Sequence, residues 1–429
     1  MKVEFSYGKG VLTVNLPENS HVMESKGGDF IRTPYEEIQR AVRNPIGTKP
    51  LVEIVKSKKK IEDVCIVVSD HTRAVPNRII LPPPFLQELQ KAGISPGQII
   101  FLVASGMHRP TSRKEKVELL GRDIAEKYRV IDHDAKNPGG LARLRRNGRE
   151  FFVNRTYAEA DLKILTGLIE PHFMAGFSGG RKSICPGIAG METIRYFHSP
   201  ALLESPFANT GTLEGNPCHE FASEMAEAAG ADFILNVTLD KKKKITGIFA
   251  GDIKKAHLAG TRHCEKENLV YVDKPFEIVI TGNGGYPLDR DLYQTVKGLV
   301  SAADIVAEGG LIICFSECVD GIGSENFRNL LFGMENSRKF LKMISKPGFF
   351  VPDQWEVEEL IKVLNKAKVR IYSSGLKGRE IEKAHMAPVK DIDRTIKDSL
   401  REYGKKVSVA AIPDGPYTMV KIKNRKKYV

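Results

Sequence analysis

The sequence predicts an α/β fold made of two domains with largely parallel sheets. Three observations support this prediction. The 429 residues exceed what one ordinary core accommodates, and 41% of them are hydrophobic, which is enough to fill two. Apolar runs of strand length alternate with segments of helical period. Polar loops follow the ends of these runs, where parallel sheets bind ligands, so we expect an active-site cleft between the domains.

The expected strands are short and rich in β-branched residues, as is typical of strands buried on both faces. They are Val64–Val68, Ile99–Val103, Val130–Asp132, Leu162–Leu165, Phe233–Val237, Glu277–Thr281, Leu311–Phe315, Val369–Tyr372 and Val407–Ala411. Apolar residues at helical spacing predict the helices between them. These are Pro84–Ala92, Arg113–Leu120, Pro217–Ala229, Lys254–Glu267, Asp291–Val300, Phe327–Ile344 and Val357–Ala367.

The domain boundary is expected near Glu265–Pro275, a segment that resembles a crossing between two α/β units. We therefore predict an N-terminal domain over residues 1–270 and a C-terminal domain over residues 275–404. The basic tail, residues 405–429, is expected to pack back on the first domain. The hydrophilic stretch Asn137–Glu150 indicates a hairpin or a loop excursion.

Composition argues against several classes of protein. The net charge of +12 comes partly from lysine runs such as Lys241–Lys244, but aromatic residues do not interleave with them, so solvated faces are favoured over nucleic-acid binding. A positive surface can attract a small anionic substrate. The six cysteines form no CxxC pair, which favours reduced thiols, and we expect a cytoplasmic protein without a secretion signal or membrane span.

Polar side chains follow three of the expected strands. Asp70 and Arg73 come after the first, His108 after the second and His172 after Leu162–Leu165. Two histidines at neighbouring strand ends suit paired acid–base chemistry near neutral pH, and an arginine can clamp a carboxylate with two hydrogen bonds.

The richest segment runs from Pro171 to His198. Its glycine-rich turn at Gly176, Gly179 and Gly180 precedes Lys182, and glycines allow a backbone to approach an anion. A lysine there can neutralise a phosphate or act as a nucleophile. The segment does not match the phosphate-loop pattern, because Arg181 stands where its second glycine belongs.

Three further candidates lie together in the second half of the chain. Tyr293, Gln294 and Lys297 fall within the first turns of one expected helix, where positions three or four apart share a face. They can present a hydroxyl, an amide and an ammonium to one anionic ligand. Trp355, the only tryptophan, is a packing residue or a pocket wall.

Two alternative functions stay open at this point. His108, His172 and His198 could hold zinc in a hydrolase, although the chain contains no HExxH pattern. The positive charge could also indicate a nucleic-acid-binding protein without catalysis.

Several motifs, taken in order, resemble the nickel-pincer lactate racemase family over nearly the whole chain. They are DHTRAVP, ASGMHRP, EPHFMAGFSGGRKSICPG, RYFH, DRDLYQTVKG and DQW. The resemblance implies an isomerase that racemises or epimerises a 2-hydroxy acid by proton-coupled hydride transfer through a 2-keto acid. Such a reaction needs a hydride-accepting cofactor, since no side chain accepts hydride.

The resemblance also implies roles for individual residues. Lys182 would be tethered to the cofactor, a nickel pincer nucleotide (pyridinium-3-thioamide-5-thiocarboxylate mononucleotide nickel), and His198 would complete the metal site. His108 and His172 resemble the acid–base pair, supported by Asp70. The remaining implied positions are substrate-positioning Arg73, Tyr293, Gln294 and Lys297, with Trp355 near the cofactor.

We also expect Ser178, Gly179 and Gly180 to approach the nucleotide phosphate. Cofactor-maturation enzymes are implied partners, and protein made without them is expected to lack the cofactor. The substrate side chain, whether of lactate, malate, a longer aliphatic acid or an aldonate, is not specified, and an oligomer is compatible with the sequence.

Overall fold

The computed structural model describes residues 1–82, 84–404 and 407–423. The chain divides into two compact units. The middle unit is Gly27–Lys266, and the terminal unit combines Met1–Lys26 with Glu267–Val429. Both units are α/β, and their main sheets are largely parallel, as predicted. Across the described residues, no helix combines the length and apolarity needed to cross a membrane.

The middle unit is built on a six-stranded sheet of order β13-β12-β9-β4-β5-β6. The pairing of β12 with β13 is antiparallel and the others are parallel. The strand bounds are β4 Val64–Ser69, β5 Ile99–Ala104, β6 Arg129–Asp132, β9 Leu162–Leu168, β12 Phe233–Leu239 and β13 Ile245–Gly251. Five of the six residues of β4 are buried, because helices cover the sheet on both sides.

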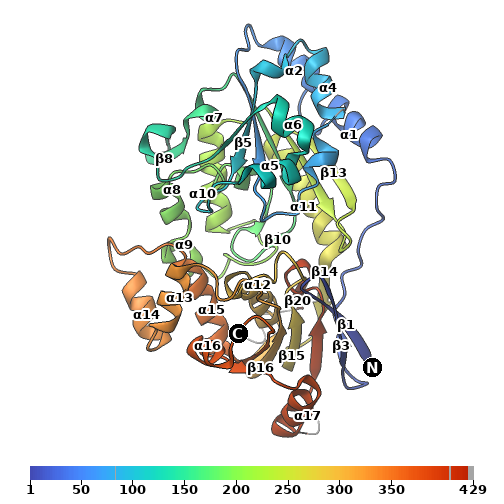
Figure 1. The fold of residues 1–429 in the computed structure, drawn as a ribbon, viewed down its shortest axis with the longest axis vertical. Helices are drawn as coiled ribbons and strands as arrows, with labels where there is room; N and C mark the ends of the chain where they lie inside the picture. Colours follow the sequence, from blue (N-terminus) through green and yellow to red (C-terminus); the bar gives the residue numbers. More distant parts are fainter. Residues whose placement is uncertain (83, 405–406, 424–429) are drawn as a thin grey trace. The chain divides into compact units, whose positions relative to one another are not determined.

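Helices and small strands surround this sheet (Figure 1). The helices are α1 Pro34–Arg43, α2 Leu51–Ser57, α3 Asn77–Ile80, α4 Pro84–Lys91, α5 Arg113–Leu120, α6 Arg122–Lys127, α7 Arg155–Glu159, α8 Met191–Phe197, α9 Pro200–Leu203, α10 Pro217–Ala229 and α11 Ile253–Asn268. Two small antiparallel pairs join β7 (Leu141–Arg146) to β8 (Arg149–Asn154) and β10 (Pro171–His172) to β11 (Gly176–Phe177). The hydrophilic stretch after Asn137 therefore enters a hairpin.

The terminal unit has its own six-stranded parallel sheet, of order β18-β17-β16-β15-β19-β3. The bounds are β3 His21–Val22, β15 Phe276–Gly282, β16 Val306–Phe315, β17 Ala367–Tyr372, β18 Ala387–Pro388 and β19 Val409–Ile412. Two further strand pairs are the hairpin of β1 (Lys2–Tyr7) and β2 (Gly10–Asn15) and the parallel pair of β14 (Leu269–Val272) and β20 (Met419–Ile422).

The helices of the terminal unit are α12 Leu292–Ala303, α13 Glu325–Phe332, α14 Ser337–Ile344, α15 Gln354–Lys366, α16 Gly378–Lys383 and α17 Ile392–Tyr403. The predicted single helix Phe327–Ile344 was wrong. The chain forms two helices there, because α13 ends at Gly333 and the Asn336 side chain accepts the Lys339 amide to begin α14.

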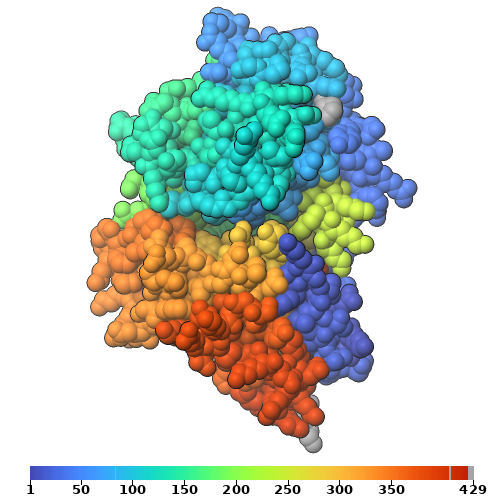
Figure 2. Space-filling model, in the orientation of Figure 1, coloured from blue at the N-terminus to red at the C-terminus, as the bar shows by residue number. Residues whose placement is uncertain are grey.

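The domain boundaries also need correction. Residues 1–26 belong to the terminal unit, because β3 pairs with β19 and the Phe5 ring packs edge-on against Phe315 at 4.9 Å. Figure 2 shows these N-terminal residues, in dark blue, against the orange and red C-terminal part. The described tail residues, through β19 and β20, likewise pair with β15 and β14 rather than with the first domain. Residues 405–406 and 424–429 of the predicted tail lie outside the described residues.

Candidate active site

Three adjacent strands of the middle unit carry the first group of candidate residues. Asp70 follows β4, His108 follows β5, and His172 lies in the turn after β9; β4 pairs in parallel with both neighbours. Parallel strands bring their carboxyl ends to one edge of the sheet. The predicted placement of these residues at strand ends is therefore confirmed.

Asp70 and His108 form a hydrogen-bonded pair. The His108 Nδ1 and Asp70 Oδ2 atoms are 2.6 Å apart, while Asp70 Oδ1 accepts bonds from the Thr72 amide at 3.2 Å and hydroxyl at 2.7 Å. Asp70 is only 3% exposed. Burial acts to raise the pKa of Asp70, but the bond and charge of His108 outweigh it and the pKa falls to about 2. An ionised Asp70 accepts the Nδ1 proton, so the neutral His108 ring has its lone pair on Nε2.

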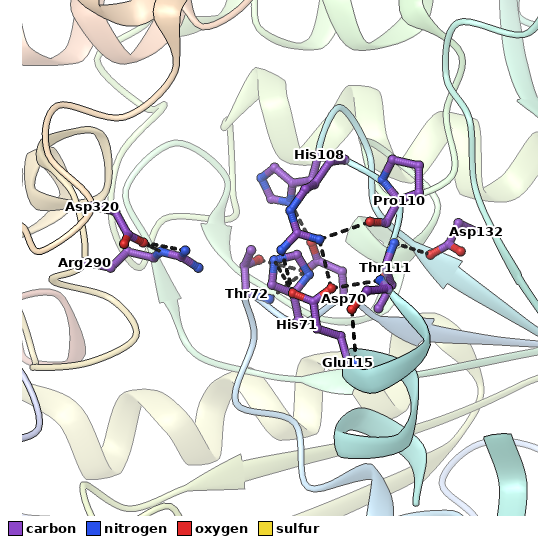
Figure 3. A network of polar contacts seen from close by, with 12 residues as sticks. Asp70, His71, Thr72, His108, Pro110, Thr111, Glu115, Asp132, Arg290 and Asp320 are labelled. Carbon is purple, nitrogen blue, oxygen red and sulfur yellow. Dashed lines mark hydrogen bonds and ion pairs between the residues drawn. The ribbon is translucent and has the colours of Figure 1, made fainter. Parts of the chain in front are cut away.

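Neighbouring ion pairs fix the loop that carries His108. Arg109 binds both carboxylate oxygens of Glu115 at 2.8 and 2.5 Å, and Glu115 accepts the Ser112 amide at the start of α5. Figure 3 shows Asp70, Thr72 and His108 within this network, with Glu115 on the first turn of α5. Bidentate arginine–carboxylate pairs fix the relative orientation of the two side chains as well as their distance.

His172 and Lys182 form the second pair. The His172 Nδ1 atom accepts the amides of Met174 at 3.2 Å and Ala175 at 3.3 Å, and its Nε2 atom lies 3.2 Å from Lys182 Nζ. A neutral ring that accepts at Nδ1 carries its proton on Nε2. The His172 proton therefore points at the Lys182 nitrogen, which can accept it only as an uncharged amine.

The electrostatic environment of Lys182 agrees with an uncharged amine. Burial first, and then the positive charges of Arg73 and Arg181, lower the pKa of Lys182 from 10.5 to about 7. The Lys182 nitrogen also lies 5.2 Å from the centre of the Phe197 ring. A substantial fraction of the amine is thus unprotonated at neutral pH, which is the nucleophilic form.

His198 lies at the C-terminal end of α8. Its Nδ1 atom is 3.1 Å from the Ile194 carbonyl, and its ring packs edge-on against Phe197 at 4.7 Å. Burial and the charge of Lys182 lower the pKa of His198 from 6.5 to about 3. The ring is therefore neutral, with its proton on Nδ1, and Nε2 is the nitrogen that can ligate a metal.

Arg73 has a partner that the sequence analysis missed. Its Nη1 atom lies 3.4 Å from Oε1 of Glu170, the residue that precedes the turn containing His172. At this distance the pair is loose, and the guanidinium keeps further donors for a carboxylate ligand. The position of Glu170 at a strand end is the feature that could have revealed it.

Ser178, Gly179 and Gly180 form a turn that is closely packed within the protein. The Ser178 amide donates to the Glu170 carbonyl at 2.9 Å, and the Gly180 amide donates to Asn236 Oδ1 at 2.8 Å. A Cβ atom at Gly180 would meet the His257 ring, and one at Gly179 would meet Ile169 and Asn236. The Ser178 and Gly180 amides are therefore bonded within the protein, and the approach of this turn to a phosphate stays a prediction.

Arg181 is the second residue that sequence reasoning missed. It is 3% exposed and donates to the Ala175 carbonyl at 2.7 Å. Burial lowers the pKa of Arg181 to about 9, so it stays a cation at neutral pH beside the chain of Lys182. By binding the backbone three residues after His172, it joins the turn between β10 and β11 to the segment that carries Lys182.

The terminal unit carries the second group of candidate residues. The Trp355 indole donates to the Tyr293 hydroxyl at 3.0 Å, and Lys297 Nζ donates to Gln294 Oε1 at 2.6 Å. Asp291 accepts the Gln294 amide and so caps α12. Burial raises the pKa of Tyr293 well above its ordinary value, so its hydroxyl stays neutral. The predicted grouping of Tyr293, Gln294, Lys297 and Trp355 is present within this unit.

Glu356 is a third residue missing from the sequence analysis. It is 2% exposed, and burial raises its pKa well above the ordinary value although the charge of Lys297 opposes this. A carboxyl group in this state is a neutral acid that can donate a hydrogen bond. Its place beside the only tryptophan could have pointed to it.

The side chains around Lys182 suit a covalently held metal cofactor in their chemistry. Lys182 offers an uncharged amine for an acyl-type link, and His198 offers a neutral imidazole nitrogen, which is compatible with nickel. Among the described residues, no group of three His, Cys, Asp or Glu side chains could hold a metal by itself. The alternative zinc site of His108, His172 and His198 is thus not formed.

The polar side chains at the ends of parallel strands are arranged as in many α/β enzymes. Residues 7–211 match the family described as Lactate racemase N-terminal domain, and residues 272–420 match the Lactate racemase C-terminal domain. The lactate racemase of Thermoanaerobacterium thermosaccharolyticum is 38% identical over 98% of this chain and 99% of that protein. The lactate racemase of Lactiplantibacillus plantarum is 34% identical over 98% and 99%.

Solved structures agree with these matches. The lactate racemase apoprotein from T. thermosaccharolyticum has a TM-score of 0.91 at 36% identity, covering 98% of this chain and all of that one. A Thermotoga maritima protein shares the fold, with a TM-score of 0.67 at 21% identity over 91% and 98% of the two chains. The chain belongs to the lactate racemase family, and it is a racemase.

Proposed function

We propose that this enzyme interconverts the two enantiomers of a small 2-hydroxy acid, with lactate as the first substrate to test. The observation that carries the proposal is the placement of the Asp70–His108 and His172–Lys182 pairs on adjacent strand ends. The names of the two curated relatives support lactate over malate, a longer aliphatic acid or an aldonate.

The proposal includes a nickel pincer nucleotide attached through Lys182, with His198 as the protein ligand of the nickel. When bound, this group would supply a ring carbon that accepts the C2 hydrogen as hydride. Such chemistry avoids a carbanion next to a carboxylate, whose negative charge makes the C2 proton very weakly acidic. Maturation enzymes that build the nucleotide are the partners that this proposal implies.

His108 is suited to accept the hydroxyl proton of the substrate. Asp70 holds the Nδ1 proton at 2.6 Å, so the Nε2 lone pair is the basic site, and the carboxylate stabilises the imidazolium that forms. The buried, ionised Asp70 therefore orients the His108 ring and stabilises its protonated form.

His172 is in the complementary state. Because the Met174 and Ala175 amides donate to Nδ1, the neutral ring carries its proton on Nε2, which faces Lys182 and could be donated to a substrate oxygen once that amine is linked to the cofactor. One histidine can thus remove a proton while the other returns one to the planar 2-keto acid after it has presented its other face. The reverse reaction exchanges the two roles.

The substrate carboxylate needs cationic and neutral donors. Arg73 offers guanidinium donors within the middle unit, and Tyr293, Gln294 and Lys297 offer a hydroxyl, an amide and an ammonium within the terminal unit. A hydroxy acid held by two such groups keeps its C2 substituents in fixed directions, which stereochemical inversion requires.

The test uses protein matured with the cofactor-making enzymes and enantiopure L- and D-lactate in deuterium oxide. Chiral chromatography should show interconversion, intact mass should show an adduct on Lys182, and the product should contain no solvent deuterium at C2. Active enzyme with an unmodified Lys182, or deuterium entering C2 during each turnover, would overturn the proposal. Malate, 2-hydroxybutyrate and an aldonate are run in parallel to identify the preferred side chain.

A further inference from the structure

We propose that the tip of the N-terminal β1–β2 hairpin is a positioning element of the substrate site. Through Asp289 this tip, Tyr7–Gly8–Lys9, fixes the start of α12, whose first two turns carry Tyr293, Gln294 and Lys297. The inference deepens the proposed function, because it uses the substrate-binding role given to that turn. The hairpin tip lies outside the family motifs, far from α12 in the sequence, whereas Asp289 is the first residue of the motif DRDLYQTVKG.

Two backbone contacts attach the hairpin tip to the loop before α12. The Gly8 amide donates to Asp289 Oδ2 at 2.6 Å, and the Gly8 carbonyl accepts the Tyr286 amide at 2.8 Å. The Tyr7 hydroxyl attaches the tip to a second loop, where it accepts a hydrogen bond from the Ser374 amide at 2.8 Å. The tip is therefore fixed from two loops of the terminal unit.

Asp289 is the junction between the hairpin and the helix. Its side chain is fully buried, and its backbone carbonyl accepts the Cys318 amide at 2.8 Å. Its carboxylate also accepts the Glu317 amide at 3.4 Å. Only two residues later, Asp291 caps α12 by accepting the Gln294 amide at 2.8 Å. A displacement of Asp289 thus moves the residue that starts the helix.

The first turn of α12 is held from the other direction by the loop after β16. The Leu292 amide donates to the Gly321 carbonyl at 3.0 Å, and the Tyr293 amide donates to the Ile322 carbonyl at 3.1 Å. With the turn fixed between that loop and the hairpin, its side chains take one direction. Small shifts of binding groups weaken binding because each hydrogen bond depends on distance and angle.

Gly8 is required at the tip for two physical reasons. Its φ of +54° lies in the left-handed region that favours glycine. A Cβ atom there would also overlap the carboxyl group of Glu317. Gly8→Ala therefore forces either the hairpin or the Glu317 loop to shift, while the amide that binds Asp289 is retained.

The first measurement is amide hydrogen exchange over Leu292–Lys297 in the full-length chain, which needs neither cofactor nor substrate. We expect Gly8→Ala and Asp289→Ala to speed this exchange about tenfold or more. Asp289→Asn keeps an oxygen for the Gly8 amide and should restore slow exchange. Gly309→Ala is the matched control, because Gly309 has a φ of +73° but no atom within 4 Å of an added Cβ.

The second measurement is the steady-state kinetics of the matured enzyme. We expect Gly8→Ala and Asp289→Ala to raise KM about tenfold with kcat changed less than about threefold. The conservative variant Asp289→Asn should restore KM towards the wild-type value, and the control Gly309→Ala should match the wild type. Unchanged exchange in both test variants, or exchange changed with KM unaltered, overturns the inference.

If wild-type holoenzyme racemises no hydroxy acid, the proposed function fails instead, and the exchange result alone decides whether the hairpin positions α12. If Gly8→Ala does not fold, the comparison of Asp289→Ala with Asp289→Asn decides the outcome.

Discussion

The indole of Trp355 donates a 3.0 Å hydrogen bond to the hydroxyl of Tyr293 and so joins the first turn of α15 to the first turn of α12. Burial keeps the Tyr293 hydroxyl neutral, so it can accept the indole proton and donate its own to a ligand. The fluorescence of the single tryptophan of the chain should therefore report on the first turn of α12.

Removal of the Tyr293 hydroxyl should affect binding more than chemistry. We expect Tyr293→Phe to raise KM by about three- to tenfold with a smaller change in kcat, because the bond orients a binding group. The emission spectrum of Trp355 should shift in the same variant. A variant with an unchanged spectrum and unchanged KM would contradict this role; exposed Tyr271→Phe is the control.

Lys182→Arg should abolish cofactor attachment while retaining a positive charge. A guanidinium stays protonated at neutral pH and does not act as a nucleophile. Intact mass spectrometry of protein matured in parallel should show the adduct on wild type and none on the variant, with racemisation lost. An adduct of equal mass on Lys182→Arg would show that the attachment lies elsewhere. Wild-type protein made without maturation enzymes should also lack the adduct.

His198→Gln should separate metal binding from cofactor attachment. The substitution removes the imidazole nitrogen proposed as the nickel ligand, but it leaves the Lys182 amine in place. We expect the matured variant to keep the mass adduct and to lose most of its nickel by elemental analysis. Exposed His21→Gln is the matched control and should retain both. Full nickel content in His198→Gln would exclude this histidine as the ligand.

Asp70→Asn should impair catalysis by removing the charge that orients and stabilises His108. We expect kcat to fall by about 10²-fold or more, because the neutral amide no longer favours the reactive tautomer. Thr72→Val removes only the 2.7 Å hydroxyl bond to Asp70 and should cost less than about threefold. Equal rates for Asp70→Asn and the wild type would show that His108 does not need this carboxylate.

The pKa of Asp70 also predicts an acid-dependent change in stability. Its folded-state pKa of about 2 lies below its ordinary value of 3.8, so the stabilisation is complete above pH 3.8 and is lost as the pH falls towards 2. The difference in unfolding free energy between wild type and Asp70→Asn should shrink across this interval in denaturant titrations. A difference that stays constant from pH 5 to pH 2 would contradict the pairing.

Lys182 predicts a pH dependence of the same sign, but in neutral to alkaline solution. Its folded-state pKa is about 7 against 10.5, so between these values the unfolded chain binds more protons than the folded one. The free energy of unfolding of the unmodified wild type, relative to Lys182→Met, should therefore rise as the pH rises from 7 to 10.5. A flat difference would mean that the folded-state pKa of Lys182 is not lowered.

The sequence predicted the buried strands of both sheets well. Strands such as β4 and β12 are short, apolar and bounded by polar loops, so their local pattern is sufficient. The β1–β2 hairpin and β3 were not predicted, because β1 and β2 are exposed on one side and β3 has two residues that become a strand only by pairing with distant β19. Such pairings depend on tertiary contacts that a local pattern does not contain.

The candidate site was predicted where chemistry and strand ends coincide. Asp70 lies beside His108 as expected, whereas the contacts of His172 with Lys182, of Arg73 with Glu170 and of Arg181 with the Ala175 carbonyl were not predicted. The glycines beside Lys182 illustrate a second difficulty. A glycine that avoids a clash with a buried side chain and a glycine that approaches a phosphate have the same sequence pattern. In the structure, an added Cβ atom would meet the His257 ring at Gly180 and the Asn236 side chain at Gly179.

The pairing of β3 with β19 has a consequence for how this chain folds as it leaves the ribosome. The middle unit is one uninterrupted stretch, so all of its sheet is synthesised before β15 to β19 of the terminal unit. His21 must wait for Ala410, which is made after every strand of the middle unit, before the other sheet acquires its edge strand. Domains generally fold as units during synthesis, so the half that contains Lys182 can be formed while the other half is still incomplete. A nascent chain thus holds Lys182 in folded surroundings before it can complete the unit that carries Lys297.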